Sequence, residues 1–255
     1  MGRVIAVANQ KGGVGKTTTS INLAASLVRT KRRVLLVDLD PQGNATMGSG
    51  VDKSQIEYST YDILIGNISL ADTRVAVEGG YDIVPTNSDL AGAEVELVNM
   101  EHRETRLRKA INTVCDDYDF ILIDCPPALS LLTVNAFAAA QTVMIPMQCE
   151  YYALEGLSDL VQTIRLVRQN LNPELEIEGL LRTMFDPRNN LSNEVSAQLR
   201  KHFGDKLYRT IIPRNIRLAE APSFGKPVIT YDLQSKGAQA YLALAGEILR
   251  RETAT

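Results

Sequence analysis

The chain has 255 residues, of which 45% are hydrophobic and 22% charged, the balance of an ordinary globular protein with a sizeable core. Its net charge of −3 gives no global attraction to nucleic acid or acidic lipid, so any DNA binding must come from a local basic patch. Three cysteines without CxxC spacing and only two histidines disfavour a disulfide scaffold, a structural zinc site and a His-rich metal site, and they predict an intracellular protein.

The first predicted elements are a strand, a glycine-rich loop and a helix. The strand is the apolar run 4–8, and apolar residues spaced i, i+3, i+4, i+7 mark the helix at Ile21, Ala24, Ala25 and Val28. Between them stands Gln10-Lys11-Gly12-Gly13-Val14-Gly15-Lys16-Thr17-Thr18. Glycines at such a turn let backbone N–H groups surround phosphate oxygens at the positive end of the helix dipole. The stretch therefore predicts a P-loop.

Two side chains of this loop have an expected role. Lys16 would neutralise the outer phosphates, and the Thr17 hydroxyl would ligate Mg²⁺. The loop is unusual in that Gln10 stands where a glycine is common and a second lysine, Lys11, enters at its start. A lone loop lysine is usually a solvated charge, so spacing alone gives Lys11 no role. A glycine turn merely capped by Thr17 would not explain why strand, loop and helix all agree.

Two further predicted strands end in aspartate. The run 34–37 leads into Asp38-Leu39-Asp40-Pro41-Gln42-Gly43-Asn44, and the run 120–123 stops at Asp124-Cys125-Pro126-Pro127. Ligands bind beyond the carboxyl ends of parallel strands, so Asp40 and Asp124 would complete a site for Mg²⁺ and phosphate. The alternative is that each aspartate only caps the next segment. A Rossmann site is disfavoured by the Lys-Thr pair, and the lack of an Asn-Lys-x-Asp motif weakens a GTPase reading without proving ATP.

The other predicted elements alternate between strand and helix. In chain order they are a helix at 61–65, a fragment at 75–77, a strand end at 81–85, and then a helix at 107–114, a strand at 143–146, a helix at 157–164, a strand at 177–183, a helix at 195–203, a strand and turn at 211–215 and a helix at 238–249. No repeat or linker interrupts them, no run nears the ~20 apolar residues of a membrane span, and the N-terminus leads straight into a strand rather than a secretory leader. We therefore expect residues 1–255 to form one doubly wound α/β domain with a mostly parallel sheet.

These motifs resemble those of the ParA/MinD family of deviant Walker A ATPases. The stretch 11–18 is similar to the family's phosphate loop, and 38–44 and 123–127 are similar to its next two motifs. Three more stretches, 149–157, 213–222 and 225–227, are similar to the small chromosomal ParA (Soj-type) partition proteins in particular. The resemblance covers nearly the whole chain.

The resemblance implies a homodimer that sandwiches two ATP molecules. Lys11 would reach across the interface to the phosphates in the other subunit, Asp40 would orient or activate the attacking water, and Asp124 would support the Thr17-bound Mg²⁺ through water. The implied nucleotide contacts are Lys11, Gly12, Gly13, Val14, Gly15, Lys16, Thr17 and Thr18 of the loop, with Pro213 and Asn215 lining the adenine pocket. Hydrolysis is expected to be slow because no arginine finger is evident.

The resemblance also implies that the ATP-bound dimer binds double-stranded DNA without sequence preference. Arg188 and Arg217 correspond to basic residues that the family uses for this binding, and Arg200 and Lys201 would widen the patch. Pairing two weak patches in a dimer raises affinity through effective concentration and makes binding steeply salt-dependent. A ParB-like centromere-binding protein would stimulate hydrolysis. We therefore expect a cytoplasmic, nucleoid-associated DNA-segregation ATPase, with chromosomal or plasmid cargo left open.

Three alternatives are weighed against this interpretation. A MinD-like membrane-associated division-site ATPase would need a basic amphipathic C-terminal helix, and 250–255 leaves no apolar face for one. A nitrogenase-reductase-like carrier would need two cysteines per subunit for an Fe–S cluster, and Cys125 lacks a partner near 91–93, so we expect it to be a packed thiol. A non-enzymatic scaffold does not explain the intact Lys16, Thr17, Asp40 and Asp124.

Overall fold

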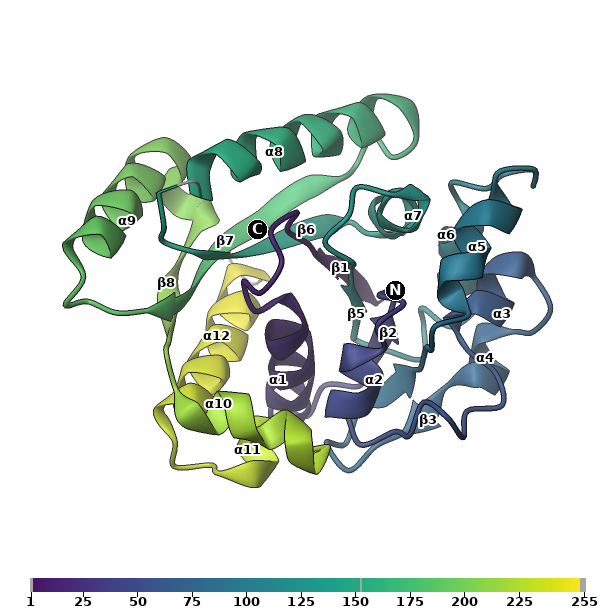
Figure 1. Ribbon diagram of the computed structural model, residues 1–255, viewed down its shortest axis with the longest axis horizontal. Helices are drawn as coiled ribbons and strands as arrows, with labels where there is room; N and C mark the ends of the chain where they lie inside the picture. Colours follow the sequence, from purple (N-terminus) through teal and green to yellow (C-terminus); the bar gives the residue numbers. More distant parts are fainter. Residues whose placement is uncertain (1, 152, 253–255) are drawn as a thin grey trace.

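The computed structural model describes residues 2–151 and 153–252. For residues 153–155 it describes the backbone alone. An eight-stranded sheet runs through it in the order β3-β4-β2-β5-β1-β6-β7-β8 (Figure 1). Every neighbouring pair is parallel except β3 with β4. The strands are β1 (Arg3–Val7), β2 (Val34–Asp38), β3 (Val75–Ala76), β4 (Asp82–Val84), β5 (Phe120–Asp124), β6 (Thr142–Gln148), β7 (Glu176–Phe185) and β8 (Leu207–Pro213). The predicted doubly wound, mostly parallel fold is confirmed.

Helices cover both faces of the sheet, which places it between two helical layers (Figure 1). One layer contains α1 (Lys16–Arg29), α2 (Asn44–Gly48), α10 (Ile216–Glu220), α11 (Val228–Tyr231) and α12 (Lys236–Glu252). The other contains α3 (Thr60–Ile65), α4 (Leu70–Thr73), α5 (Leu90–Leu97), α6 (Arg106–Asn112), α7 (Leu131–Ala139), α8 (Ala153–Asn170) and α9 (Asn190–Phe203). Two 3₁₀ turns, Gly204–Lys206 and Ala221–Phe224, are the remaining helical elements of the described residues. No described helix has the length and apolar character to cross a bilayer.

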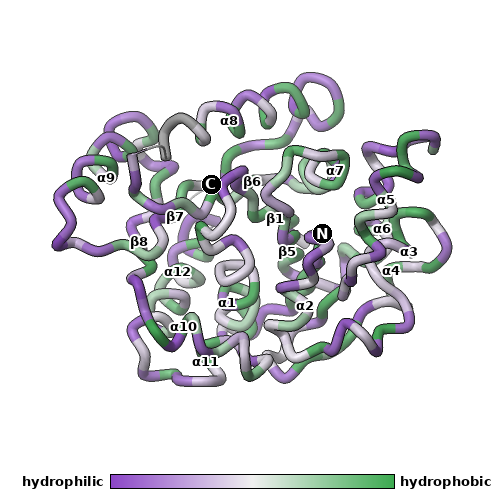
Figure 2. Tube along the Cα trace, in the orientation of Figure 1, coloured by the Kyte–Doolittle hydropathy of each residue, from purple (hydrophilic) through white to green (hydrophobic). Residues whose placement is uncertain are grey.

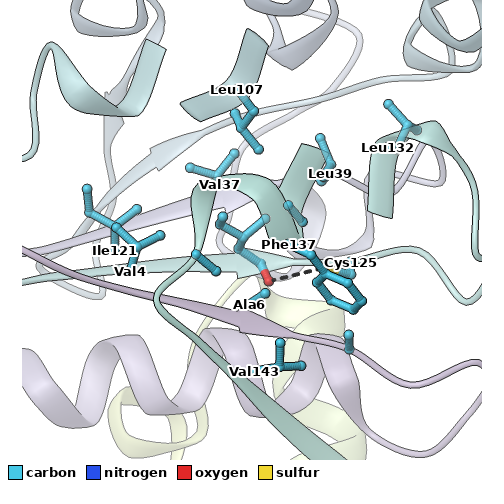
Figure 3. Close-up of a cluster of buried hydrophobic side chains, with 14 of the residues drawn as sticks. Val4, Ala6, Val37, Leu39, Leu107, Ile121, Cys125, Leu132, Phe137 and Val143 are labelled. Carbon is cyan, nitrogen blue, oxygen red and sulfur yellow. Dashed lines mark hydrogen bonds between the residues drawn. The ribbon is translucent and has the colours of Figure 1, made fainter. Parts of the chain in front are cut away.

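The alternation of side chains along the central strands divides the core in two. Ile5 of β1 packs in the α1 and α12 layer, whereas Val4 and Ala6 face the opposite layer. The buried strands are therefore apolar on both faces, and Figure 2 shows green, hydrophobic stretches where β1 and β5 run through the centre of the molecule. Figure 3 shows the core on the side that Val4 and Ala6 face, where Val4 lies beside Ile121 of β5 and Ala6 lies nearer to Phe137 of α7.

The structure differs from the predicted elements mainly at their ends. Strand β2 ends at Asp38, so Asp40 lies two residues beyond it rather than at its end. Helix α9 begins at Asn190, well before the apolar residues that predict it, because the Asn189 side chain caps it by accepting a hydrogen bond from the Ser192 N–H at 3.4 Å. Strand β8 likewise begins earlier, at Leu207.

The last helix is joined to the edge strand β8 by one buried carboxylate. Glu247 is 6% exposed and accepts hydrogen bonds from the Arg209 N–H at 2.8 Å, the Thr210 N–H at 2.9 Å and the Thr210 hydroxyl at 2.7 Å. Arg251 pairs with the same carboxylate at 2.9 Å. Burial alone would raise the pKa of Glu247, but these hydrogen bonds outweigh it and lower the pKa below the ordinary value.

Replacing Glu247 with glutamine should lower the free energy of unfolding by about 1–3 kcal/mol at neutral pH, because an amide cannot accept all four donors. Since the folded pKa is lowered, this stabilisation is present above the unfolded pKa and is lost as the pH falls through the folded pKa. The gap between variant and wild type should therefore narrow in acid, as measured by urea denaturation over a pH series. The matched control Glu176→Gln, which breaks an exposed ion pair with Lys206, should change stability by less than about 0.5 kcal/mol. A gap that stays constant with pH would contradict this account.

Candidate functional site

The predicted P-loop lies between β1 and α1, where β1 is flanked by β5 and β6 and the strand order reverses. Gly13 and Gly15 have φ values of +73° and +88°, the left-handed region in which side chains are strained. A Cβ built on Gly12 or Gly13 would meet no atom within 4 Å. The loop therefore surrounds open space instead of packing against the protein, and it offers backbone groups to a ligand.

Polar donors in and around the loop lack close acceptors among the described residues. Gly15 precedes α1 and provides no side-chain cap, so the first N–H groups of a 14-residue helix lack one. Lys16 is only 7% exposed, and among the described residues its amine donates to the Lys11 carbonyl at 3.4 Å without an ion pair. The Gln10 Nε2 is buried without a described partner. Burial lowers the pKa of Lys16, although Asp124, Cys125 and Asp40 offset part of that effect. A buried cation, unpaired donors and a helix N-terminus together fit the phosphates of a nucleotide.

Asp124, at the end of β5, joins the loop helix to the sheet. Its carboxylate is fully buried and accepts the Thr17 hydroxyl and the Ser20 hydroxyl, each at 2.8 Å. Burial raises the pKa of Asp124, and these hydrogen bonds and Lys16 act in the opposite direction. A hydroxyl and a carboxylate held together are hard oxygen ligands of the type that Mg²⁺ prefers. The structure thus brings the predicted Thr17 and Asp124 together, while the role of Ser20 has no signal in the sequence.

A second buried carboxylate holds the loop that carries Asp40. Asp38 lies opposite Asp124 in the β2–β5 register and accepts the Thr46 N–H at 2.8 Å, the Thr46 hydroxyl at 2.7 Å and the Asp40 N–H at 3.2 Å. Burial and the nearby Asp124 raise the pKa of Asp38. Asp40 itself is 8% exposed, and its Oδ1 accepts the Gln42 N–H at 3.0 Å. No role is assigned to Asp38 from the sequence, although the Asp-x-Asp spacing at the end of a buried strand is a signal for a second functional carboxylate.

The two loop lysines lie in different surroundings. Lys11 is half-exposed, its backbone N–H donates to the Asn9 side chain at 3.0 Å, and its amine pairs with Glu150, just beyond β6. Lys16, in contrast, is buried inside the loop. The amine of Lys11 thus lies at the protein surface in a contact with its own chain.

Strand β7 contacts the other side of the loop, and β8 lies next to β7 in the sheet. The Thr183 hydroxyl donates to the Val14 carbonyl at 2.7 Å, which fixes the loop to β7. Pro213 ends β8 opposite Phe185, and Asn215 caps α10 by accepting the Leu218 N–H at 3.4 Å. Pro213 and Asn215 are both half-buried. Pro213 is the last residue of the parallel strand β8 and Asn215 comes two residues later, so both lie at the carboxyl edge of the sheet, as the P-loop does. This placement is compatible with an adenine pocket.

The basic residues predicted to bind DNA are exposed but paired. Arg188, in the turn before α9, is 89% exposed and holds both oxygens of Asp186, at 3.0 and 2.8 Å. Arg217 in α10 pairs with Glu220 at 2.8 Å and Asp232 at 3.2 Å. Exposed ion pairs of this kind contribute little stability, so a phosphate can replace the carboxylate. The other two candidate basic residues, Arg200 and Lys201, are exposed on α9.

The cysteines lie in the packed interior. Cys115, Cys125 and Cys149 are buried free thiols, and the Cys125 Sγ lies 3.7 Å from the Ile123 carbonyl (Figure 3). Burial strongly raises the pKa of Cys125, which disfavours the thiolate form that binds metals. Within the described residues no group of three or more His, Cys, Asp or Glu side chains is placed to hold a metal.

Comparison with known proteins identifies relatives over the full chain. The profile of a family described as an AAA domain matches residues 2–177. The sporulation initiation inhibitor protein Soj of Bacillus subtilis is 55% identical over 249 residues, covering 97% of this chain and 98% of that protein. The chromosome partitioning protein ParA of Myxococcus xanthus is 54% identical over 254 residues, covering 99% and 90% respectively.

A solved structure agrees with this assignment at the level of the fold. The Mycobacterium smegmatis protein named cobyrinic acid a,c-diamide synthase, solved with an ATP analog and magnesium, has a TM-score of 0.88 and 38% identity. The match covers 99% of this chain and 96% of that one. The relatives match this chain almost from end to end. The chain belongs to the ParA/Soj family of chromosome-partitioning ATPases.

Proposed function

We propose that two copies of this chain dimerise around two ATP molecules, bind double-stranded DNA without sequence preference, and release it after hydrolysis. The observation that carries this proposal is the buried Lys16 amine, which lacks an ion pair among the described residues and faces an open glycine loop. A buried cation is costly unless an anion accompanies it, and a triphosphate supplies that anion.

The side chains around the loop divide the work of binding and hydrolysis. Backbone N–H groups of 11–18 and the Lys16 amine would hold the phosphates, and the Thr17 hydroxyl would ligate Mg²⁺, with Asp124 supporting the ion through water. When bound, Mg²⁺ neutralises negative charge on the phosphate oxygens. Asp40, held by the Asp38 hydrogen bond, orients the attacking water. Pro213 and Asn215 line the adenine.

Dimerisation requires a cation that can leave its own subunit, and Lys11 meets that requirement. Its amine lies at the surface beside Glu150 and is not buried with Lys16, so it can reach the phosphates of a second copy. That contact exists only in the dimer, which makes ATP the link between the subunits. None of the side chains that this proposal assigns to the nucleotide site is an arginine that could act as an arginine finger. Intrinsic turnover is therefore slow, and a ParB-like centromere-binding partner accelerates it.

DNA binding then depends on the number of basic patches in one particle. Arg188 and Arg217 give a monomer few phosphate contacts, and a dimer doubles them on one surface. Retention on the nucleoid within the cytoplasm follows from this nucleotide-controlled affinity. The partition name of the Myxococcus xanthus relative, at 54% identity, favours this role over a MinD-like membrane role or the amide synthesis named for the solved structure at 38%.

The first test of this function removes the buried cation. Lys16→Ala should weaken ATP binding by about 10- to 150-fold, because a charge-assisted contact to the phosphates is lost. Nucleotide-dependent dimerisation and DNA retention should disappear with it. Calorimetric titration with ATP and a DNA-retention assay with and without nucleotide would measure both. Unchanged ATP affinity would contradict the placement of the phosphates.

A second variant separates binding from hydrolysis. Asp40→Ala should bind ATP and dimerise but hydrolyse at least about 100-fold more slowly, because the attacking water is no longer oriented. The protein should therefore accumulate on DNA in the presence of ATP. Steady-state phosphate release and DNA retention, measured on the same preparation, test this. A variant that turned over at the wild-type rate would remove Asp40 from the mechanism.

A third variant separates dimerisation from DNA binding. Arg217→Ala should dimerise with ATP yet lose DNA, and the slope of log affinity against log salt should fall by about 2, since each dimer loses two phosphate contacts. The control Arg29→Ala removes the same charge from the exposed last turn of α1, at the amino edge of the sheet, and should leave the slope unchanged. Equal slopes for Arg217→Ala and wild type would exclude Arg217 from the DNA surface.

A further inference from the structure

The half-exposed ion pair between Lys11 and Glu150 has no role in the function proposed so far. Glu150 is the second residue after β6, and it is the carboxylate that pairs with Lys11 among the described residues. The exposed fractions of the two side chains are 45% and 50%. The pair therefore lies within reach of a second copy of the chain.

Both partners are held in place by their backbones. The side chain of Asn9 connects the start of the loop to β6: its Nδ2 donates to the Pro146 carbonyl at 2.8 Å, and its Oδ1 accepts the Lys11 N–H at 3.0 Å. Near Glu150, the Cys149 carbonyl accepts the Ser192 hydroxyl of α9 at 3.2 Å, and the Glu150 N–H donates to the Gln148 carbonyl at 3.0 Å. The carboxylate is thus presented to Lys11 by a fixed segment.

We propose that Glu150 is a positioning residue that holds the Lys11 amine on its own subunit in the monomer. Dimerisation then exchanges this carboxylate for the phosphates of the nucleotide in the other subunit. This inference rests on the proposed ATP-linked dimer. A lysine that is paired in the monomer does not form the crossed contact unless a stronger anion replaces Glu150, and a triphosphate carries more negative charge than one carboxylate. The released Glu150 can turn to solvent, because half of its side chain is already exposed.

The size of the effect follows from the exposure of the pair. An exposed ion pair contributes little on its own, but one Lys11–Glu150 pair in each subunit, two in all, is broken when a dimer forms. Removing both ion pairs by Glu150→Gln should therefore tighten the ATP-bound dimer by about 2- to 30-fold. A contact of this strength biases the equilibrium toward the monomer and remains easy to exchange.

The test uses the full chain carrying Asp40→Ala, so that hydrolysis does not empty the dimer. The dimer dissociation constant is measured by sedimentation velocity with ATP and Mg²⁺ for this chain and for the same chain with Glu150→Gln. Both measurements are then repeated on chains that also carry Lys11→Ala, at raised protein concentration. Glu174→Gln, which removes the same charge from an exposed site before β7, is the matched control. We expect Glu150→Gln to tighten the dimer only when Lys11 is present, and Glu174→Gln to have no effect.

Each other outcome overturns the inference in a recognisable way. If the Asp40→Ala chain stays monomeric with ATP, the proposed dimer and the role of Glu150 fall together. If it dimerises but Glu150→Gln leaves the constant unchanged, the role of Glu150 alone is wrong. If Glu150→Gln tightens the dimer by the same factor in chains that carry Lys11→Ala, the carboxylate acts through the overall charge of the subunit and does not hold Lys11.

Discussion

The hydrogen bonds from Thr17 and Ser20 to the buried Asp124 determine the geometry on which the rest of the site depends. They join the first turns of α1 to the end of β5, so the phosphate loop between β1 and α1 cannot shift relative to the sheet. The Thr183 hydroxyl bonds the same loop to β7 from the other side. A loop held at both flanks keeps its glycine N–H groups in place before a ligand arrives, which reduces the ordering that binding requires.

The basic side chains assigned to phosphate binding differ in their surroundings. Lys16 is buried without an ion pair among the described residues, Lys11 is paired with Glu150 at the surface, and Arg188 and Arg217 are each paired with carboxylates of their own chain. In the proposed function, Lys16 would bind the nucleotide of its own subunit. The three surface cations would each exchange a carboxylate for a phosphate, and weak exposed pairs permit that exchange. Under this proposal, the dimer contact and DNA binding would both replace one anion by another.

Much of this arrangement could be predicted from sequence because its signals are local. Glycine spacing, the Lys-Thr pair and apolar runs that stop at aspartate predicted the P-loop, the central strands and the meeting of Thr17 with Asp124. Helix α7 gave no such signal, because Leu131–Ala139 is apolar on nearly all sides and has no amphipathic period. Helices as short as α2 and α10, with five residues each, are likewise shorter than the window that periodicity needs.

Long-range contacts account for what sequence could not predict. Lys11 pairs with Glu150 across a separation of 139 residues. No spacing rule predicts this pair, because it depends on β1 and β6 lying side by side in the sheet. The ion pairs of Arg188 and Arg217 are closer in sequence but depend on turn geometry that composition does not determine.

In the proposed function, a triphosphate joins two copies of this chain. Sedimentation equilibrium of the wild-type protein with Mg²⁺ and a non-hydrolysable ATP analogue, compared with ADP, measures this association. We expect dimers with the analogue and monomers with ADP at the same protein concentration. Monomers under both conditions, in a protein shown by titration to bind the analogue, would contradict it.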